Sequence, residues 1–315
     1  MGEMNKIVVM IPCLNEEKTI GDVINDFRKE LPGAEIYVFD NASTDSSAEI
    51  ARKAGANVVS VSRRGKGNVI RTMFKTLDAD IYVMADGDGT YSASSVHSLI
   101  TPIADHGADM VIGDRLSSTY FDENKRPFHN TGNRLVRRLI NWIFNSDTHD
   151  LLSGYRAFSR RFVKSVALQS KGFEIETELT VAAIVNDFNI EEVAIGYKDR
   201  ASGSKSKLNT YSDGILILST ILKLFRDYKP MLFFSIIAMG LACVAIGMNI
   251  PVFNDYLATG KVDRFPTLFC GGFLMTGALM LFCVGLILQV ISNRNKVIID
   301  NLLLKFNEEK RNQEV

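Results

Sequence analysis

Two long stretches without a charged residue constrain the fold of this sequence more than any other feature. Residues Met231 to Phe253 and Phe265 to Ile291 contain no Asp, Glu, Lys or Arg. A helix needs roughly 20 apolar residues to cross the hydrocarbon core of a bilayer, and such uninterrupted runs are rare in the core helices of soluble proteins. The sequence therefore predicts two transmembrane helices, 231–253 and 265–291.

The charges around these two runs predict their orientation. The connecting loop, 254–264, carries balanced charges, whereas basic residues lie on the outer sides of both runs, at Arg226, Lys229, Arg294 and Lys296. Since basic residues concentrate in cytoplasmic segments next to spans, we expect both termini on the cytoplasmic side.

The rest of the chain divides into three parts on this view. The first residues hold only a short apolar run before Pro12, which does not fit a secretory signal peptide. We therefore expect residues 1–208 to form a cytoplasmic domain at the membrane. Segment 209–230 mixes apolar and charged residues, as an interfacial helix would, although a core helix fits equally well. Residues 292–315 form a predicted cytoplasmic tail.

Composition excludes several other classes of protein. The chain has 36 basic and 36 acidic side chains, so nothing indicates a nucleic-acid partner. Its four cysteines show no CxxC spacing, and three of them lie in very apolar surroundings. We expect reduced thiols, with neither a disulfide framework nor a cysteine metal site.

The predicted cytoplasmic domain alternates short apolar runs with charged segments of helical spacing, which is typical of a parallel α/β sheet. The predicted strands are 7–11, 36–39, 58–61, 81–84 and 110–112. Ligands bind such sheets outside the carboxyl ends of the strands. Polar clusters follow all five predicted strands, and they include Asn15, Glu16, Asp40, Asn41, Asp45, Lys66, Asp86, Asp88, Asp114 and Arg115.

The run YVMADGDGTYS, Tyr82 to Ser92, is the most specific of these clusters. Two neighbouring carboxylates, Asp86 and Asp88, raise each other's proton affinity unless a cation lies between them. A hard divalent ion such as Mg²⁺ suits them, because it is held by one or two carboxylates plus substrate phosphates. The glycine-rich fingerprints of dinucleotide and P-loop sites are missing. We therefore expect a metal to hold a nucleotide diphosphate, helped by Lys66 of RRGKG, although that basic loop also fits a solvated turn.

Five motifs, in order, carry a resemblance to a known family: IPCLNEEKTI, VFDNASTDSS, RRGKGNVIR, MADGDGTY and DLLSGYRAFSRR. Over about residues 5–210 the chain resembles the inverting family-2 glycosyltransferases of GT-A fold, above all the dolichol-phosphate mannose synthases and bacterial polyisoprenyl-phosphate glycosyltransferases. The resemblance implies a Rossmann-like mixed sheet with helices on both faces, followed by the interfacial helix and the two transmembrane helices. It implies Mg²⁺ or Mn²⁺ at Asp86 and Asp88, and a nucleotide pocket lined by Pro12, Leu14, Glu16, Asp40 and Asp45.

The resemblance also implies catalytic roles for Asp88, Arg115 and Asp150. The family tends to have GSR where this chain has IGDR, so Asp114 adds a carboxylate beside Arg115. Asp150 would orient the acceptor or act as a base, or it would cap a turn. Glu174 and Glu176 are further acidic candidates, although Glu176 and Glu178 also fit the exposed first turn of a helix.

The predicted membrane anchor points to a lipid acceptor, polyprenyl phosphate. A phosphate monoester is already largely a dianion at neutral pH, so it needs positive charge around it rather than a strong base. The candidate phosphate ligands are Arg115, Arg134, Arg156, Arg200, Lys205 and Lys207. A general attraction of the basic segment from Arg200 to Lys207 to anionic lipids is the simpler alternative.

We therefore expect a membrane-bound enzyme that transfers a hexose, from a UDP-glucose-like donor or GDP-mannose, to undecaprenyl or dolichyl phosphate at the cytoplasmic leaflet with inversion. One alternative is a non-catalytic, membrane-anchored scaffold that binds nucleotide sugars. Another is transfer to a lipid-linked sugar hydroxyl, which would make Asp150 an obligatory base. The tail contains apolar residues among its charges, so we expect a homo-oligomer, although the tail could instead pack on its own chain or lie on the membrane.

The predicted topology can be tested with reporters. A reporter fused after Val315 should lie in the cytoplasm, and one inserted near Thr259 should lie on the far side of the membrane, because the basic residues flank the outer ends of both spans. Labelling with a membrane-impermeant reagent measures this. Labelling of the Val315 fusion and protection of the Thr259 insertion would reverse the topology.

Overall fold

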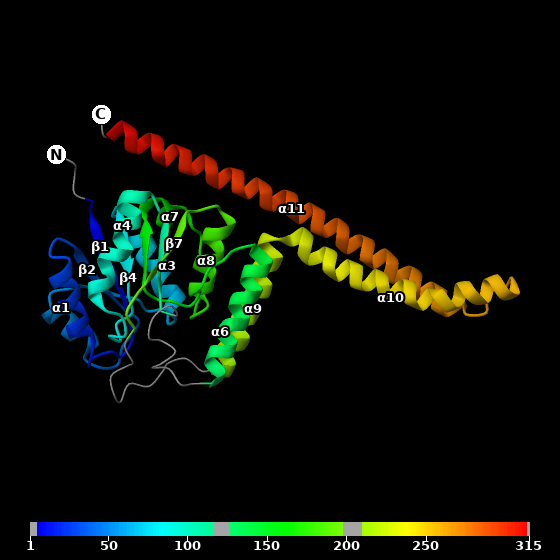
Figure 1. Ribbon diagram of the computed structural model, residues 1–315, viewed down its shortest axis with the longest axis horizontal. Helices are drawn as coiled ribbons and strands as arrows, with labels where there is room; N and C mark the ends of the chain where they lie inside the picture. Colours follow the sequence, from blue (N-terminus) through cyan, green and yellow to red (C-terminus); the bar gives the residue numbers. More distant parts are fainter. Residues whose placement is uncertain (1–4, 116–126, 198–209, 314–315) are drawn as a thin grey trace. The chain divides into compact units, whose positions relative to one another are not determined.

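A computed structural model describes residues 5–115, 127–197 and 210–313, and within these ranges most side chains. The described chain falls into two compact units, Met1–Ile221 and Leu222–Val315. The first unit contains a seven-stranded sheet with helices on both of its faces (Figure 1). The second unit consists mainly of two long helices.

The sheet has the strand order β3-β2-β1-β4-β6-β5-β7. The five strands predicted from the sequence are present as β1 (Ile7–Cys13), β2 (Glu35–Asp40), β3 (Asn57–Ser60), β4 (Ile81–Met84) and β5 (Met110–Asp114). Two more strands complete it, β6 (Arg156–Ser159) and β7 (Ile190–Ala194). The sheet is mixed, because β6 pairs antiparallel with both β4 and β5. The local pattern alone predicted a purely parallel sheet and missed this insertion.

The two faces of the sheet are covered by different helices. Alternate residues of β1, such as Val9 and Ile11, pack in one core with helices α1 (Ile20–Glu30), α2 (Ser47–Lys53) and α4 (Val96–His106). On the opposite face, aromatic contacts join α3 (Lys66–Thr76) and α7 (Arg160–Ser165) to β6 through Phe158. Helix α8 (Ile175–Val185) lies on this second face as well, because Thr180 accepts a hydrogen bond from Arg156 of β6. Helices bury both faces of the sheet, and this explains why β1 and β4 are continuous apolar runs.

The strand directions gather the polar clusters at one edge of the sheet. Strands β1, β2, β3 and β4 are mutually parallel, and β5 shares their direction because it is antiparallel to β6, which is antiparallel to β4. Their carboxyl ends therefore face the same way, as the sequence predicted. Since β6 lies between β4 and β5, Asp114 and Arg115 are displaced sideways from Asp86 by two strand spacings, about 10 Å.

The remaining helices include α6 (Pro127–Phe144) in the first unit and α9 (Thr210–Tyr228), which begins in the first unit and ends in the second. In the second unit, α10 (Pro230–Thr259) and α11 (Phe265–Gln313) pack against each other as a hairpin. Segments Pro230–Thr259 and Phe265–Ile299 have the length and hydropathy of membrane spans. Many of their apolar side chains point outward, with Met239 and Leu279 about two-thirds exposed. Contiguous apolar surface of this kind fits contact with lipid.

The described part of the predicted C-terminal tail is helical and continuous with the second long helix. Helix α11 runs without a break from Phe265 to Gln313, so residues 292–313 continue the second apolar helix. The sequence between Ser292 and Gln313 contains neither Gly nor Pro, so no residue there ends a helix.

The loop RRGKG before α3 is fixed by close backbone contact. Gly67 donates its N–H to the carbonyl groups of Lys171 and Gly172, at 3.1 and 3.2 Å. A Cβ atom on Gly65 would lie 2.1 Å from the Lys171 carbonyl oxygen, and one on Gly67 would lie 2.3 Å from that of Ser170. Only glycine leaves room for this approach, so the two glycines bring α3 up to segment 169–172.

Substitution of Gly67 by Ala should lower the thermal unfolding midpoint of the protein in detergent. Helix propensity alone would stabilise this variant by about 1 kcal/mol, but the collision with Ser170 should cost about 1–3 kcal/mol, so the sign of the change is diagnostic. Gly33→Ala is the matched control, because nothing lies within 4 Å of the added Cβ there. An unchanged or raised midpoint for Gly67→Ala would contradict the close contact.

Candidate active site

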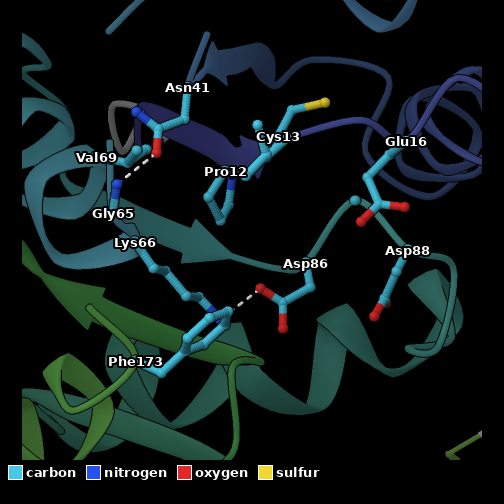
Figure 2. A pocket seen from close by; sticks show the side chains of 12 residues that line it. Pro12, Cys13, Glu16, Asn41, Gly65, Lys66, Val69, Asp86, Asp88 and Phe173 are labelled. Carbon is cyan, nitrogen blue, oxygen red and sulfur yellow. Dashed lines mark hydrogen bonds and ion pairs between the residues drawn. The ribbon is translucent and has the colours of Figure 1, made fainter. Parts of the chain in front are cut away.

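A cavity of about 240 Å³ lies at the carboxyl ends of β1 and β4 (Figure 2). Most of its lining comes from the strand-end loops that the sequence singled out. The residues that line it are Pro12, Cys13, Leu14, Glu16, Asn41, Gly65, Lys66, Val69, Asp86, Gly87, Asp88 and Phe173. Seven of the predicted donor and metal residues therefore lie together, namely Pro12, Leu14, Glu16, Asn41, Lys66, Asp86 and Asp88.

Lys66 connects two carboxylates in the wall of this cavity. Its Nζ atom lies 2.6 Å from Asp86 Oδ1 and 2.6 Å from Glu176 Oε1. The side chains of Lys66 and Glu176 are each only 8% exposed, whereas Asp86 is 25% exposed and faces the cavity. Burial alone would lower the pKa of Lys66, but the two carboxylates outweigh it and raise the pKa well above its usual range. The group is therefore an ammonium ion at neutral pH, with one partner in the cavity and one in the core.

The surroundings of this ammonium ion are tightly packed. The Phe173 ring lies 5.8 Å from Lys66 Nζ, measured to its centroid (Figure 2), a cation–π distance. A Cβ atom on Gly154 would lie 2.5 Å from Asp86 Oδ2 and 3.1 Å from Lys66 Nζ. The Gly154 N–H donates to the Tyr91 hydroxyl at 2.9 Å. Gly154 in DLLSGYR is thus required for the close approach of Asp86 and Lys66.

Asp88 lies at the other side of the same loop. One of its oxygens, Oδ1, accepts hydrogen bonds from the Thr90 N–H and hydroxyl, at 3.2 and 2.7 Å. Asp86, Asp88 and the nearby Glu16 all line the cavity, but no cluster of three or more metal-ligating side chains occurs among the described residues. A pair of carboxylates fits a hard divalent ion that completes its coordination with substrate phosphates and water.

Three other predicted donor residues lie outside the lining of the cavity and hold its loops. Asn15 Oδ1 accepts the Thr44 N–H at 2.8 Å, and Asp45 Oδ1 accepts the Ser47 N–H at 3.0 Å. Asp40 is 8% exposed and accepts the Ser43 N–H at 3.3 Å. The contact of Asn15 with Thr44 connects the loops after β1 and β2, and so does the Glu17 N–H, which donates to Asp45 Oδ2 at 3.2 Å. The contacts of Asp40 with Ser43 and of Asp45 with Ser47 lie within segment 40–47.

Asn41 has both roles. It lines the cavity, and its side chain also joins the loops after β2 and β3: the amide donates to the carbonyl groups of Val61 and Arg63, while its oxygen accepts the Gly65 N–H. The neighbouring Arg63 and Arg64 are exposed. Of the three basic residues in RRGKG, only Lys66 lies in the cavity wall.

Arg115 and Asp150 form a second ionic centre. Arg115 Nε donates to Asp150 Oδ2 at 2.8 Å, and a second guanidinium nitrogen donates to Oδ1 at 2.9 Å. The Arg115 backbone N–H also donates to Oδ2, at 3.1 Å. Asp150 is fully buried, and burial would raise its pKa, but the Arg115 guanidinium outweighs burial and lowers it. A carboxylate held in this way is a poor proton acceptor.

Arg156 differs from its prediction as a ligand of the acceptor phosphate. Its side chain is completely buried, and its N–H groups donate to the carbonyl oxygens of Ser153 and Leu151 and to Thr180 Oγ1, at 2.9, 2.7 and 2.9 Å. Burial lowers the pKa of Arg156 to about 10, so it stays charged at neutral pH. In this arrangement it fixes the DLLSG turn that presents Asp150 and Gly154.

The acidic residues of FEIETE are also placed differently from the exposed helix turn that the sequence allowed. Glu174, Glu176 and Glu178 are all less than 7% exposed. Glu178 accepts the N–H groups of Gln169 and Ser170, and Glu174 accepts those of Lys171 and Gly172. Two of the acids therefore hold segment 169–172 against the RRGKG loop, and the third, Glu176, holds Lys66.

The remaining predicted phosphate ligands are Arg134, Arg200, Lys205 and Lys207, of which Arg134 does not line the cavity. Arg134 is exposed on α6, and Arg200, Lys205 and Lys207 lie outside the described residues.

The fold and the cavity define a glycosyltransferase of GT-A fold. Residues 8–167 match the family model described as "Glycosyl transferase family 2". The chain belongs to this family of glycosyltransferases. It is 35% identical over 257 residues to "Glycosyltransferase AglJ" of Haloferax volcanii, a match that covers 81% of this chain and 83% of that protein.

Two further comparisons are informative. A "Dolichyl-phosphate hexose transferase" of Haloferax volcanii is 29% identical over 223 residues, which cover 71% of this chain and 95% of that protein. Glucosyl-3-phosphoglycerate synthase from Mycobacterium tuberculosis in complex with UDP matches with a TM-score of 0.58 and 25% identity, over 70% of this chain and 80% of that one. Another structure of that synthase, with a TM-score of 0.59 at 24% identity over the same shares, contains Mn²⁺ and UDP.

The ion pair of Arg115 and Asp150 predicts a pH-dependent cost for breaking it. In the wild type the lowered pKa of Asp150 contributes stability that is present above about pH 4 and is lost as the pH falls through the folded-state pKa. In Arg115→Gln the buried carboxylate loses its main partner, so its pKa rises and it destabilises the fold increasingly as the pH rises.

The loss of stability relative to the wild type should therefore be larger at pH 7.5 than at pH 4.5. At pH 7.5 it should approach about 3–5 kcal/mol. Thermal unfolding of both proteins in detergent at the two pH values measures this. A loss that is equal at both pH values, or larger at the lower one, would show that Asp150 is not held by Arg115.

Proposed function

We propose that the protein transfers a hexose from a nucleotide-diphosphate sugar to polyprenyl phosphate at the cytoplasmic leaflet, with inversion and with a divalent metal. The observation that carries this proposal is the state of Asp150. Both of its oxygens are bound by Arg115, at 2.8 and 2.9 Å, so the carboxylate best placed by family resemblance to act as a base is already engaged.

A phosphate acceptor needs no such base. Its second pKa lies near 6, so it is largely a dianion at neutral pH and can attack the anomeric carbon directly. A sugar hydroxyl needs a group that removes its proton, and general-base catalysis contributes about 10²–10⁴ in rate. The engaged Asp150 therefore favours the phosphate acceptor over a lipid-linked sugar hydroxyl. The name of the dolichyl-phosphate hexose transferase relative supports the same acceptor class.

The cavity suits the diphosphate of the donor. Asp86 and Asp88 would hold Mg²⁺ or Mn²⁺ there, and the bound ion would neutralise the leaving diphosphate. Lys66 supplies a further positive charge beside Asp86, and Pro12, Leu14 and Val69 supply apolar surface. UDP in the related synthase supports a UDP sugar as donor, with GDP-mannose as the alternative.

The acceptor phosphate would approach from the side of Arg115, which remains 12% exposed. Arg134, Arg200 and Lys205 are the other proposed ligands of this phosphate. Two helices long enough to span a membrane would keep this site within reach of lipid headgroups, with both termini in the cytoplasm. A homo-oligomer formed through the C-terminal tail is part of the same proposal.

Product analysis tests the proposal directly. Purified full-length protein should transfer sugar from one member of a panel of UDP and GDP sugars to undecaprenyl or dolichyl phosphate, and excess chelator should stop the reaction. Transfer only to a lipid-linked saccharide would favour the hydroxyl acceptor. Nucleotide-sugar binding without any product, in the presence of metal and lipid, would favour a non-catalytic scaffold.

A mechanism without a general base predicts different effects for substitutions at Asp88 and at Asp150. Asp88→Asn should abolish transfer and weaken donor binding, because Asp88 holds the metal. Asp150→Asn should lower the rate by less than about 10²-fold, below the span that a lost general base gives in most enzymes, because the amide can still accept one hydrogen bond from Arg115. Initial rates and binding of the nucleotide sugar measure both effects.

A loss of about 10²–10⁴-fold for Asp150→Asn, with donor and lipid binding unchanged, would contradict the base-free mechanism.

Arg156→Lys serves as the structural comparison for these two substitutions. It should lower the thermal unfolding midpoint, because lysine cannot reach the three acceptors that Arg156 now binds.

A further inference from the structure

The Lys66 ammonium ion pairs with Asp86, the same carboxylate that the proposed divalent metal would bind. It is 2.6 Å from Asp86 Oδ1, and Asp86 is one of the two carboxylates proposed to hold the metal. A dication bound by Asp86 would repel an ammonium ion at this distance, and at a few ångströms in a partly buried site such repulsion is strong. The two cations therefore compete for the same carboxylate.

Glu176 offers the ammonium ion another partner. Its Oε1 atom is also 2.6 Å from Lys66 Nζ, and its side chain is 8% exposed and does not line the cavity. It is carried by α8, in the core, whereas Asp86 follows β4 and is 25% exposed. Glu176 is therefore shielded from a metal that approaches through the cavity, and a short movement would leave Lys66 paired with Glu176 alone.

We propose that Glu176 is a positioning residue that retains the Lys66 ammonium when a divalent cation takes Asp86. The inference rests on the proposed metal at Asp86 and Asp88. Without Glu176, the cation that binds Asp86 leaves Lys66 buried beside a dication with no carboxylate partner. Lys66 would then hold Asp86 against the metal. With Glu176, the exchange leaves every buried charge paired, so Asp86 is released at little cost.

The local structure allows this exchange with a small movement of one side chain. Phe173 covers the ammonium ion from one side at 5.8 Å, and Gly154 leaves no space for a side chain beside Asp86. Lys66 follows Gly65, and its helix is held by the contact of Gly67 with segment 169–172. Only the end of the lysine side chain has to move, and both of its partners lie within its reach.

The test measures binding of Mn²⁺ alone to the full-length protein in detergent, from the loss of the free-ion signal in electron paramagnetic resonance. Glu176→Gln should weaken Mn²⁺ binding by at least about 10-fold, as expected for the loss of one close charge in a partly buried site. Adding Lys66→Met to that variant should restore binding to the wild-type level or beyond, because the competing ammonium ion is gone.

Glu178→Gln is the matched control. Glu178 is a buried acid of the same helix turn, but it accepts backbone N–H groups of Gln169 and Ser170, so its loss should leave Mn²⁺ affinity within about 2-fold, since no charge beside Asp86 changes. An equal loss in Glu176→Gln and Glu178→Gln would assign the effect to segment 169–172 and overturn the exchange. A double variant that binds no better than Glu176→Gln would do the same.

Two outcomes separate this inference from the proposed metal dependence. Wild-type protein that binds no Mn²⁺, with or without UDP, overturns both. Mn²⁺ that binds the wild type and Glu176→Gln equally overturns only the role of Glu176, and so does Mn²⁺ that binds the wild type only with UDP, since the diphosphate then supplies the charge assigned to Glu176. If Glu176→Gln does not fold, Lys66→Met decides: the exchange requires it to bind Mn²⁺ more tightly than the wild type, and unchanged or weaker binding rejects it.

Discussion

The buried ammonium ion of Lys66 is the interaction on which the rest of the site depends. An isolated charge in a protein interior is very costly, so Lys66 is held only because Asp86 and Glu176 lie on either side of it, each at 2.6 Å. These partners come from the loop after β4 and from α8, so one lysine side chain connects the N-terminal half of the sheet to the helix that covers its second face. The cavity exists at the place where these elements meet.

Close backbone contacts make this meeting possible. Gly65 and Gly67 let the loop before α3 touch segment 169–172, and Gly154 lets Asp86 and Lys66 approach. Segment 169–172 is held in turn by Glu174 and Glu178, which each accept two backbone N–H groups. The acids of α8 and the glycines of RRGKG and DLLSG thus form one support for the cavity wall. The apolar strand cores give this support a fixed base.

The second ionic centre shows how a motif residue acquires its role. Arg115 binds both oxygens of Asp150. Arg156 fixes the turn that runs from Asp150 to Gly154. Sequence reasoning placed Arg156 among the phosphate ligands because of its charge. Side chains alternate along β6, so Arg156 and Phe158 lie on one face of the sheet and Ala157 lies on the other. This position directs the Arg156 side chain into the interior of the fold. Glu176 was open to a similar misjudgement, although one signal was present: acids at every second position of a helix cannot all face solvent, because successive pairs lie on opposite sides of it.

The sequence by itself determined the two apolar helices, the five parallel strands, the polar strand ends and the family, because each of these depends on local periodicity or on short motifs. The tertiary structure alone decided the antiparallel insertion of β6, the burial of Arg156 and the pairing of Lys66 with Glu176. Those two residues are 110 positions apart, and no local pattern encodes which distant charge will be nearest after the sheet has formed. A carboxylate in a sequence is only a candidate. The order of strands and the room left by three glycines determine whether it meets a metal, a lysine or a backbone amide.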